Sequence, residues 1–295
     1  MISDRYRLLR LIDVGGMGEV WAARNELTQK CFAIKFLLPA LAERPDALAR
    51  FVREAETAGK LDHPSIVDVF DVAQAEDGRP FIVMELLAGE SLEARIERTG
   101  PLTSLDAASL LAQIAAALAV AHAAGVVHRD LSTANVFLAR DPEGGRPVPK
   151  ILDFGVSKSI GAAVLEGNRT AHGAVLGCPE YMSPEQAQGA EGVDARTDIW
   201  SVGAVLYHAL SGVTPFRSHN YNALISALLT RPHRRLSEVV PSVDPELAGL
   251  VEACLVKDRA RRIQTAADLA SRLSAVARRL AAASGETATQ RRRVT

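Results

Sequence analysis

Short apolar segments near the beginning of this chain predict strands. Residues 6–12 and 32–38 are rich in apolar side chains, and the alternation in the second segment places Ala33, Lys35 and Leu37 on one face. A lysine inside such a segment is costly unless a negative group contacts it. We therefore expect Lys35 to have an anionic partner.

Three later segments extend this pattern. Residues 47–61 have helical composition and no proline, residues 81–89 form an apolar strand that leads into a connector with glycine, and residues 150–152 form a short buried strand. The chain therefore mixes strands and helices, with the strands concentrated near its beginning.

One apolar segment is long enough to span a bilayer. Residues 107–127 contain no charged side chain. They are rich in alanine, however, and include Ser109, Gln113 and His122. We expect a buried helix at the centre of a globular unit, and no membrane span.

Composition excludes several classes of protein. The chain has 295 residues, of which 48% are hydrophobic, so it can bury a large core. A formal net charge of -1 gives no global field for nucleic acid or for an acidic membrane surface. The three cysteines have no CxxC spacing and the seven histidines no HExxH pattern, which argues against disulfides and structural zinc. We predict a cytoplasmic protein, since charged residues interrupt any secretory segment at the N-terminus.

The strongest chemical signal lies in the strings HRDLSTANVFL (128–138) and KILDFGVSK (150–158). Asp130 and Asn135 are five residues apart on a short loop after a helix, so both side chains can point into one cleft. Asp130 can accept a hydroxyl proton, while Asn135 offers a carbonyl oxygen to a hard cation, and Asp153 adds a carboxylate for the same cation. Base, metal ligand and metal ligand in this order are the apparatus of phosphoryl transfer from a nucleotide.

A glycine-rich turn follows the first strand, in the string VGGMGEV (14–20). Glycines let backbone amides approach phosphate oxygens. A second strand follows this turn, whereas a dinucleotide fingerprint would be followed by a helix, and the Gly-Lys-Ser/Thr of a P-loop is missing.

These strings resemble the glycine-rich loop, catalytic loop and DFG segment of protein kinases, and GGMGEV, YMSPEQ and HPSIV are most similar to bacterial Ser/Thr kinases. The resemblance covers residues 6 to about 280. It implies an α+β bilobal fold, with an antiparallel-sheet N-lobe that carries one helix and a larger, mainly helical C-lobe. We place the N-lobe at 1–88, the C-lobe at 89–280 and a flexible basic tail at 281–295.

The resemblance also implies the roles of individual residues. Lys35 would contact the ATP phosphates and a helix glutamate, for which Glu54 is favoured over Glu56. Catalytic residues would be Asp130, Lys35 and Glu54, and Mg²⁺ ligands would be Asn135 and Asp153. Met84 would be the gatekeeper beside the adenine contacts. The full set of expected nucleotide-binding residues is Ile12, Asp13, Val14, Gly15, Gly16, Met17, Gly18, Glu19, Val20, Ala33, Lys35, Met84, Glu85 and Leu87.

The activity implied is transfer of the ATP γ-phosphate to Ser or Thr hydroxyls of protein substrates. Arg262 would pair with Glu185 at the end of the activation segment, and Thr170 would be an autophosphorylation site, with a homodimer for reaction in trans left open. Three residues depart from the family pattern: Asp13 replaces the first glycine of the loop, Ser132 a lysine and Cys178 a threonine. They keep a nucleotide-binding pseudokinase scaffold open as an alternative. A small-molecule kinase is a weaker one.

Overall fold

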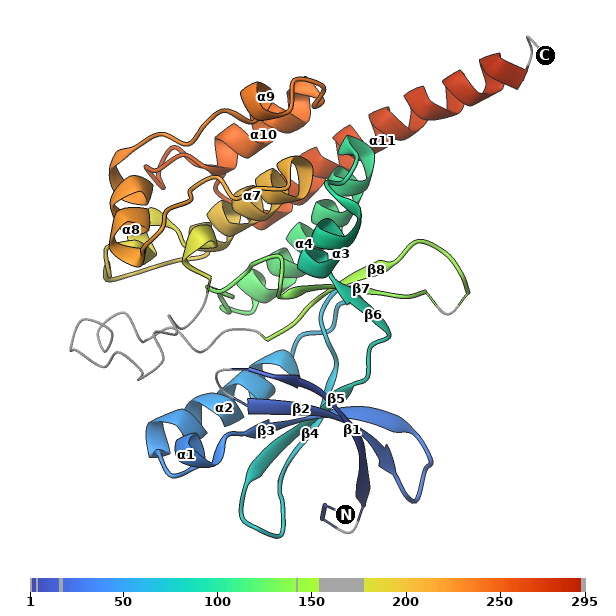
Figure 1. Ribbon diagram of the computed structural model, residues 1–295, viewed down its shortest axis with the longest axis vertical. Coiled ribbons are helices and arrows are strands. Elements are labelled where there is room, and N and C mark those ends of the chain that lie inside the picture. The colour runs from blue at the N-terminus through green and yellow to red at the C-terminus, as the bar shows by residue number, and fades with distance from the viewer. Residues whose placement is uncertain (1, 4, 16–17, 142, 154–177, 293–295) are drawn as a thin grey trace.

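A five-stranded antiparallel sheet forms the smaller part of the molecule (Figure 1). The computed structural model describes residues 2–3, 5–15, 18–141, 143–153 and 178–292, without the side chains of residues 50, 54 and 285–292. The strand order is β1-β2-β3-β5-β4. The strands are β1 (Tyr6–Val14), β2 (Gly18–Asn25), β3 (Cys31–Leu37), β4 (Val69–Gln74) and β5 (Pro80–Glu85).

Close packing in this sheet explains one glycine of the expected phosphate loop. A Cβ on Gly18 would lie 2.0 Å from the carbonyl oxygen of Phe36 on the neighbouring strand. The residue must therefore be glycine for the β2–β3 pairing, whatever the turn binds. Helix α2 (Pro45–Ala58) covers one face of the sheet and packs Phe51 and Ala55 against Leu37 and Ile82.

The larger lobe is mainly helical, as expected, and contains the main hydrophobic core. A small sheet in the order β6-β7-β8 lies between it and the five-stranded sheet (Figure 1). The small sheet and the helices of the larger lobe are β6 (Gly89–Ser91), α3 (Leu92–Thr99), α4 (Ser104–Ala123), β7 (Val136–Ala139), β8 (Val148–Ile151), the 3₁₀ turn Pro179–Tyr181, α6 (Pro184–Ala187), α7 (Arg196–Ser211), α8 (Tyr221–Thr230), α9 (Leu236–Val239), α10 (Pro245–Cys254) and α11 (Ala266–Arg292).

Helix α4 is the uncharged segment that was expected to be a buried helix. Its N-terminus is capped by Thr103, whose hydroxyl accepts a hydrogen bond from the Asp106 amide, and residues such as Leu111, Ile114 and Leu118 are fully buried in the main core. It is the one helix among the described residues with the length and apolar composition of a membrane span, and half of its most apolar stretch is buried. The prediction of a buried core helix is confirmed.

Two expectations about the fold are corrected. The N-lobe carries a second, four-residue helix, α1 (Pro39–Ala42), before α2. The flexible tail expected from residue 281 is wrong as far as Arg292, because α11 continues to that residue and projects beyond the other helices (Figure 1). Alanines 281–283 have high helix propensity and no proline interrupts the segment, so the helix continues from its packed part.

Candidate active site

A buried aspartate of α7 holds the loop that leads to Asp130. The carboxylate of Asp198 is fully buried and accepts hydrogen bonds from the amides of His128, at 2.9 Å, and Arg129, at 2.8 Å. His122 of α4 contacts the same carboxylate through Nε2 at 2.8 Å. Arg129 has a φ of 65°, a left-handed conformation that is unfavourable for a side chain with a Cβ and that these bonds maintain.

The ring of His128 joins the candidate catalytic loop to the strand before Asp153. Its Nδ1 accepts from the Asp130 amide at 3.2 Å, so the proton lies on Nε2, which donates to the Leu152 carbonyl at 3.1 Å. Asn135 closes the loop, since its Nδ2 donates to the Asp130 backbone carbonyl at 2.8 Å and its backbone carbonyl accepts from the Leu152 amide at 2.9 Å. The interpretation of His128 as a packing residue of this loop is confirmed.

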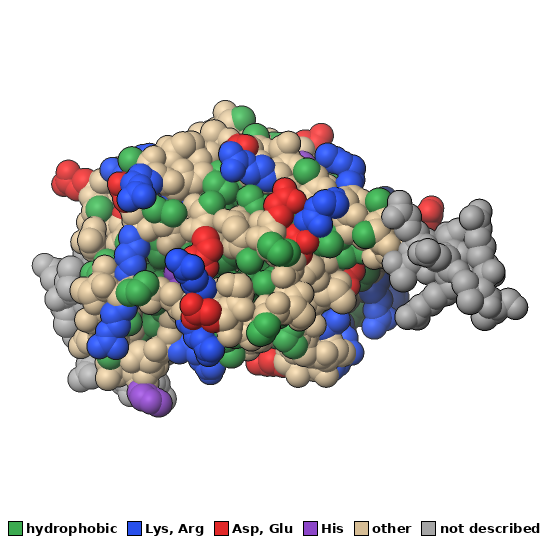
Figure 2. Space-filling model, turned by 90° about the horizontal axis from the view of Figure 1, so that it is seen from above, with side chains coloured by type: hydrophobic (Ala, Val, Ile, Leu, Met, Phe, Trp, Pro, Cys, Tyr) green, Lys and Arg blue, Asp and Glu red, His purple; other side chains and the backbone are tan. Residues whose placement is uncertain are grey.

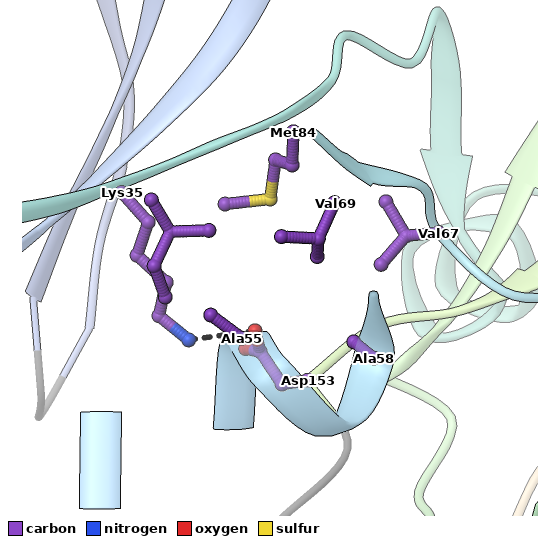
Figure 3. A pocket seen from close by; sticks show the side chains of 8 residues that line it. Lys35, Ala55, Ala58, Val67, Val69, Met84 and Asp153 are labelled. Carbon is purple, nitrogen blue, oxygen red and sulfur yellow. Dashed lines mark hydrogen bonds and ion pairs between the residues drawn. The ribbon is translucent and has the colours of Figure 1, made fainter. Parts of the chain in front are cut away.

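Lys35 has the anionic partner that its place in a strand required. Its Nζ lies 2.6 Å from Oδ1 of Asp153, a residue 118 positions later in the chain (Figure 3). Lys35 is buried, whereas the Asp153 side chain is half exposed and its backbone has a φ of 47°. The helix glutamate expected beside Lys35, Glu54, lies on α2, but its side chain is outside the described residues.

A pocket that opens to solvent adjoins this ion pair, with about 280 Å³ of empty space when the open solvent is included. Figure 3 shows Lys35 at the left of it, Asp153 below, Met84 above and Val67 at the right. Two alanines of α2, Ala55 and Ala58, leave the space that larger side chains would fill, and Ile82 completes the wall.

The expected nucleotide residues of the sheet lie on neighbouring strands. Val20 of β2 is opposite Lys35 of β3, and Ala33 of β3 is opposite Met84 of β5. Glu85 ends β5, and its amide donates to the Asp68 carbonyl at 2.9 Å. Leu87 follows in the connector, and Ile12 and Glu19 are on β1 and β2.

The glycine-rich turn is described only in part. Asp13 is exposed, and its Oδ1 accepts a hydrogen bond from the Val14 amide at 2.8 Å. The Gly15 amide donates to the Gly18 carbonyl at 2.9 Å. Gly16 and Met17 lie outside the described residues, as does Thr170.

Comparisons with known proteins agree with this geometry. The family model described as "protein kinase domain" matches residues 6–273. The chain belongs to the protein kinase family. It is 37% identical over 280 residues to the Ser/Thr-protein kinase pkn3 of Myxococcus xanthus, covering 93% of this chain and 50% of that protein. It is also 37% identical over 279 residues to PknA of Mycobacterium tuberculosis, covering 93% and 62%.

Solved structures show the same fold. A cysteine-to-alanine mutant of the Mycobacterium tuberculosis PknI kinase domain superposes with a TM-score of 0.70 at 25% identity, covering 94% of this chain and 97% of that one. The chain spans about half the length of the curated relatives that it matches.

The pair expected at the end of the kinase activation segment is present. The terminal nitrogens Nη1 and Nη2 of Arg262 donate to the two carboxylate oxygens of Glu185, at 2.7 and 3.1 Å, and both side chains are buried. The guanidinium also lies over the ring of Trp200, with 5.2 Å between Cζ and the ring centroid. This bidentate contact fixes the segment before α7, as expected.

Two of the three departures from the kinase pattern, Ser132 and Cys178, lie close together at the candidate catalytic loop. Ser132 is buried, and its hydroxyl lies close to the Cys178 thiol without making a hydrogen bond of acceptable geometry. Burial raises the pKa of Cys178, Ser132 lowers it, and the Asp130 carboxylate raises it further. The thiol near Asp130 therefore stays protonated.

Sequence reasoning missed two polar contacts near the site. Lys150 of β8 donates to Glu85 Oε2 at 2.7 Å and to the Ile66 carbonyl at 3.3 Å, which joins the end of β5 to the strand before Asp153. Its place in a buried strand was the signal, as for Lys35. The second contact is a chain of hydrogen bonds from the Thr133 hydroxyl to the Tyr181 hydroxyl, at 2.7 Å, and from there to His208 Nδ1, at 2.6 Å. No local pattern signals it.

Proposed function

We propose that this chain is an ATP-dependent protein kinase that transfers the γ-phosphate to Ser or Thr hydroxyls of protein substrates. One observation carries the proposal: the fold brings Lys35 to 2.6 Å from Asp153, directly beside the loop that fixes Asp130 and Asn135. The named Ser/Thr kinases among the relatives support the same conclusion.

Each of these residues has a distinct task. Lys35 is buried, so its ammonium is positioned for the phosphates with little loss of side-chain freedom. The Asp130 carboxylate takes the proton of the substrate hydroxyl while that oxygen bonds to the γ-phosphorus and ADP leaves. The bonds from His128 and Asn135 to the Asp130 backbone keep this carboxylate in position.

The donor set fits Mg²⁺. Asn135 uses Nδ2 for the Asp130 carbonyl, which leaves Oδ1 as the acceptor oxygen, and Asp153 supplies a half-exposed carboxylate. Among the described residues, no cluster of three or more His, Cys, Asp or Glu side chains could hold a metal alone. This agrees with Mg²⁺ bound by one or two protein oxygens together with nucleotide phosphates, where it neutralises developing charge.

The surroundings support a protein substrate and a cytoplasmic location, both of which we include in the proposal. Basic and acidic side chains are interspersed on the face of the larger lobe shown in Figure 2, with no single-sign area there for nucleic acid. Cys31, Cys178 and Cys254 are free thiols, as a reducing compartment would keep them. We place the N-lobe at 1–88 and the C-lobe at 89–280. This boundary lies between β5, in the five-stranded sheet, and β6, in the three-stranded sheet.

The test is incubation of the purified chain with γ-labelled ATP and Mg²⁺, followed by identification of acid-stable phosphoresidues in the chain and in a generic protein substrate. The proposal predicts labelled Ser or Thr that is lost on chelation of Mg²⁺. Binding of ATP without any transfer would instead indicate the pseudokinase scaffold.

A further inference from the structure

Two hydroxyl groups join the candidate catalytic loop to α7. Thr133, three residues after Asp130, is fully buried, and its hydroxyl lies 2.7 Å from that of Tyr181. The Tyr181 hydroxyl in turn lies 2.6 Å from Nδ1 of His208, a half-buried residue near the end of α7. Because Asp198 near the start of α7 holds the residues before Asp130, this helix is tied to the loop on both sides of the aspartate.

The direction of this relay of Thr133, Tyr181 and His208 is set by its last member. Each hydroxyl has one proton to donate, and an imidazole nitrogen accepts only while it is unprotonated. With Nδ1 unprotonated, Tyr181 donates to His208 and Thr133 donates to Tyr181, so both hydroxyl protons have an acceptor. Burial raises the pKa of the Tyr181 phenol, which therefore keeps its proton. Of the three side chains, only the imidazole titrates near neutral pH.

A proton on Nδ1 reverses the relay. The imidazolium then donates to Tyr181, Tyr181 donates to Thr133, and the Thr133 proton has to turn to another acceptor. The carboxylate of Glu93 on α3 is near enough for this, since burial and Glu97 raise the pKa of Glu93 whereas the Thr133 hydroxyl lowers it. The hydrogen bonds of the described side chains include none of good geometry from Thr133 to Glu93, so Thr133 has to shift to make one.

The groups that face His208 favour its neutral form. Burial and Arg217, in the segment after α7, lower the pKa of His208, whereas Glu97 of α3 raises it. Tyr181 of the 3₁₀ turn is neutral, and the Glu180 carboxylate beside it acts on the tyrosine. Since the pKa of His208 lies below its usual 6.5, the relay runs toward His208 at neutral pH and reverses as the pH falls below that value.

We propose that His208 is a positioning residue for phosphoryl transfer: while neutral it holds Thr133 through Tyr181, and its protonation releases the loop and slows transfer. This inference rests on the proposed kinase activity. The Asp130 carboxylate has to lie within hydrogen-bond reach of the substrate hydroxyl, so a shift at Thr133 lowers the rate of transfer. ATP binding should change little, because the proposed contacts to adenine are on the five-stranded sheet and its connector.

The experiment measures kcat for a threonine peptide with labelled ATP between about pH 5.5 and 8, in the wild type and in His208→Asn. The asparagine places an amide oxygen where Nδ1 lies, so it accepts from Tyr181 at every pH. Between about pH 7.5 and 5.5, kcat should fall about fivefold further in the wild type than in His208→Asn, the factor of one neutral hydrogen bond. KM for ATP should differ less than about twofold between the two proteins. His219→Asn, at an exposed histidine before α8, is the control and should keep the wild-type profile.

Further variants test the two hydroxyls. Thr133→Val and Tyr181→Phe keep the shapes of the side chains but remove one hydroxyl each, and each should lower kcat about fivefold at pH 7.5. The double variant should lose no more than either single one, because all three interrupt the same relay. Thr133→Ser keeps the hydroxyl and should restore most of the rate. Melting temperatures identify any variant that is unfolded in the assay, and the Asn and Ser variants then carry the test by themselves.

The outcomes separate the two proposals. Equal pH profiles of kcat for the wild type and His208→Asn, with threonine still phosphorylated, overturn the role of His208 and leave the kinase function standing. An effect of Thr133→Val that is confined to KM for ATP also overturns the inference, as does a Thr133→Ser variant as slow as Thr133→Val. No phosphorylation of any peptide or of the chain itself refutes the kinase function and this inference with it.

Discussion

Replacement of Arg262 by methionine should destabilise the larger lobe strongly. The substitution keeps the length of the apolar stem but leaves the Glu185 carboxylate, whose side chain is 8% exposed, without its cation. It also leaves the carbonyl of Arg196, which Arg262 contacts at 2.6 Å, without this donor. Breaking a buried pair on one side costs about 3–5 kcal/mol. For a domain of this size that lowers the melting temperature by roughly 10 °C.

The assay is thermal unfolding followed by circular dichroism, with a double-mutant cycle. Arg262→Met/Glu185→Gln should lose about as much stability as either single variant, since the second change removes the charge that the first left unpaired. Arg272→Met is the control, because its pair with Asp268 is exposed at 53% and 43% and should contribute about 0.5 kcal/mol or less. An Arg262→Met melting temperature within about 2 °C of the wild type would refute the reasoning.

Three further predictions concern the site. Ser132→Lys and Cys178→Thr should each raise kcat little, but together by more than the product of the single effects, as measured by steady-state kinetics; strictly multiplicative effects would contradict a single hydrogen-bonded unit. Burial lowers the pKa of His208, so the stability that the neutral imidazole contributes is present above about pH 6.5 and is lost as the pH falls below that value. His208→Gln should therefore reduce the fall in melting temperature between about pH 7.5 and 5.5. An unchanged fall would show that His208 is not the titrating group. Lys150→Met should raise KM for ATP about tenfold with little change in kcat, because the hinge loses its tie at Glu85, and Lys150→Arg should restore it; a change in kcat alone would contradict a role in positioning the nucleotide.

Spacing along the chain was enough to select the candidate site residues from the sequence, and their roles remain proposals. Asp130, Asn135 and Asp153 come from two ordered strings, and the period-two pattern around Lys35 required an anionic partner. The identity of that anion could not be predicted. The structure shows that it is Asp153, 118 positions away. No local pattern encodes this contact, because it depends on how distant segments pack together.

The remaining differences have the same origin. The tie from Lys150 to Glu85 joins residues 65 positions apart, and the bond from Thr133 to Tyr181 joins residues 48 apart. Composition misled us at residue 281, where small and polar side chains suggested a linker. Helix propensity and the packed part of α11 before it outweigh that composition.

The most direct test of the account compares wild type with Asp130→Asn for both ATP binding and phosphate transfer. The asparagine keeps the shape of the side chain but cannot take the hydroxyl proton, while Lys35, Asn135 and Asp153 are unchanged. We predict an ATP dissociation constant within about twofold of the wild type by calorimetry, and a loss of about 10²–10⁴ in the rate of transfer to Ser or Thr from labelled ATP. Wild-type turnover in the Asp130→Asn variant would contradict the account at its centre.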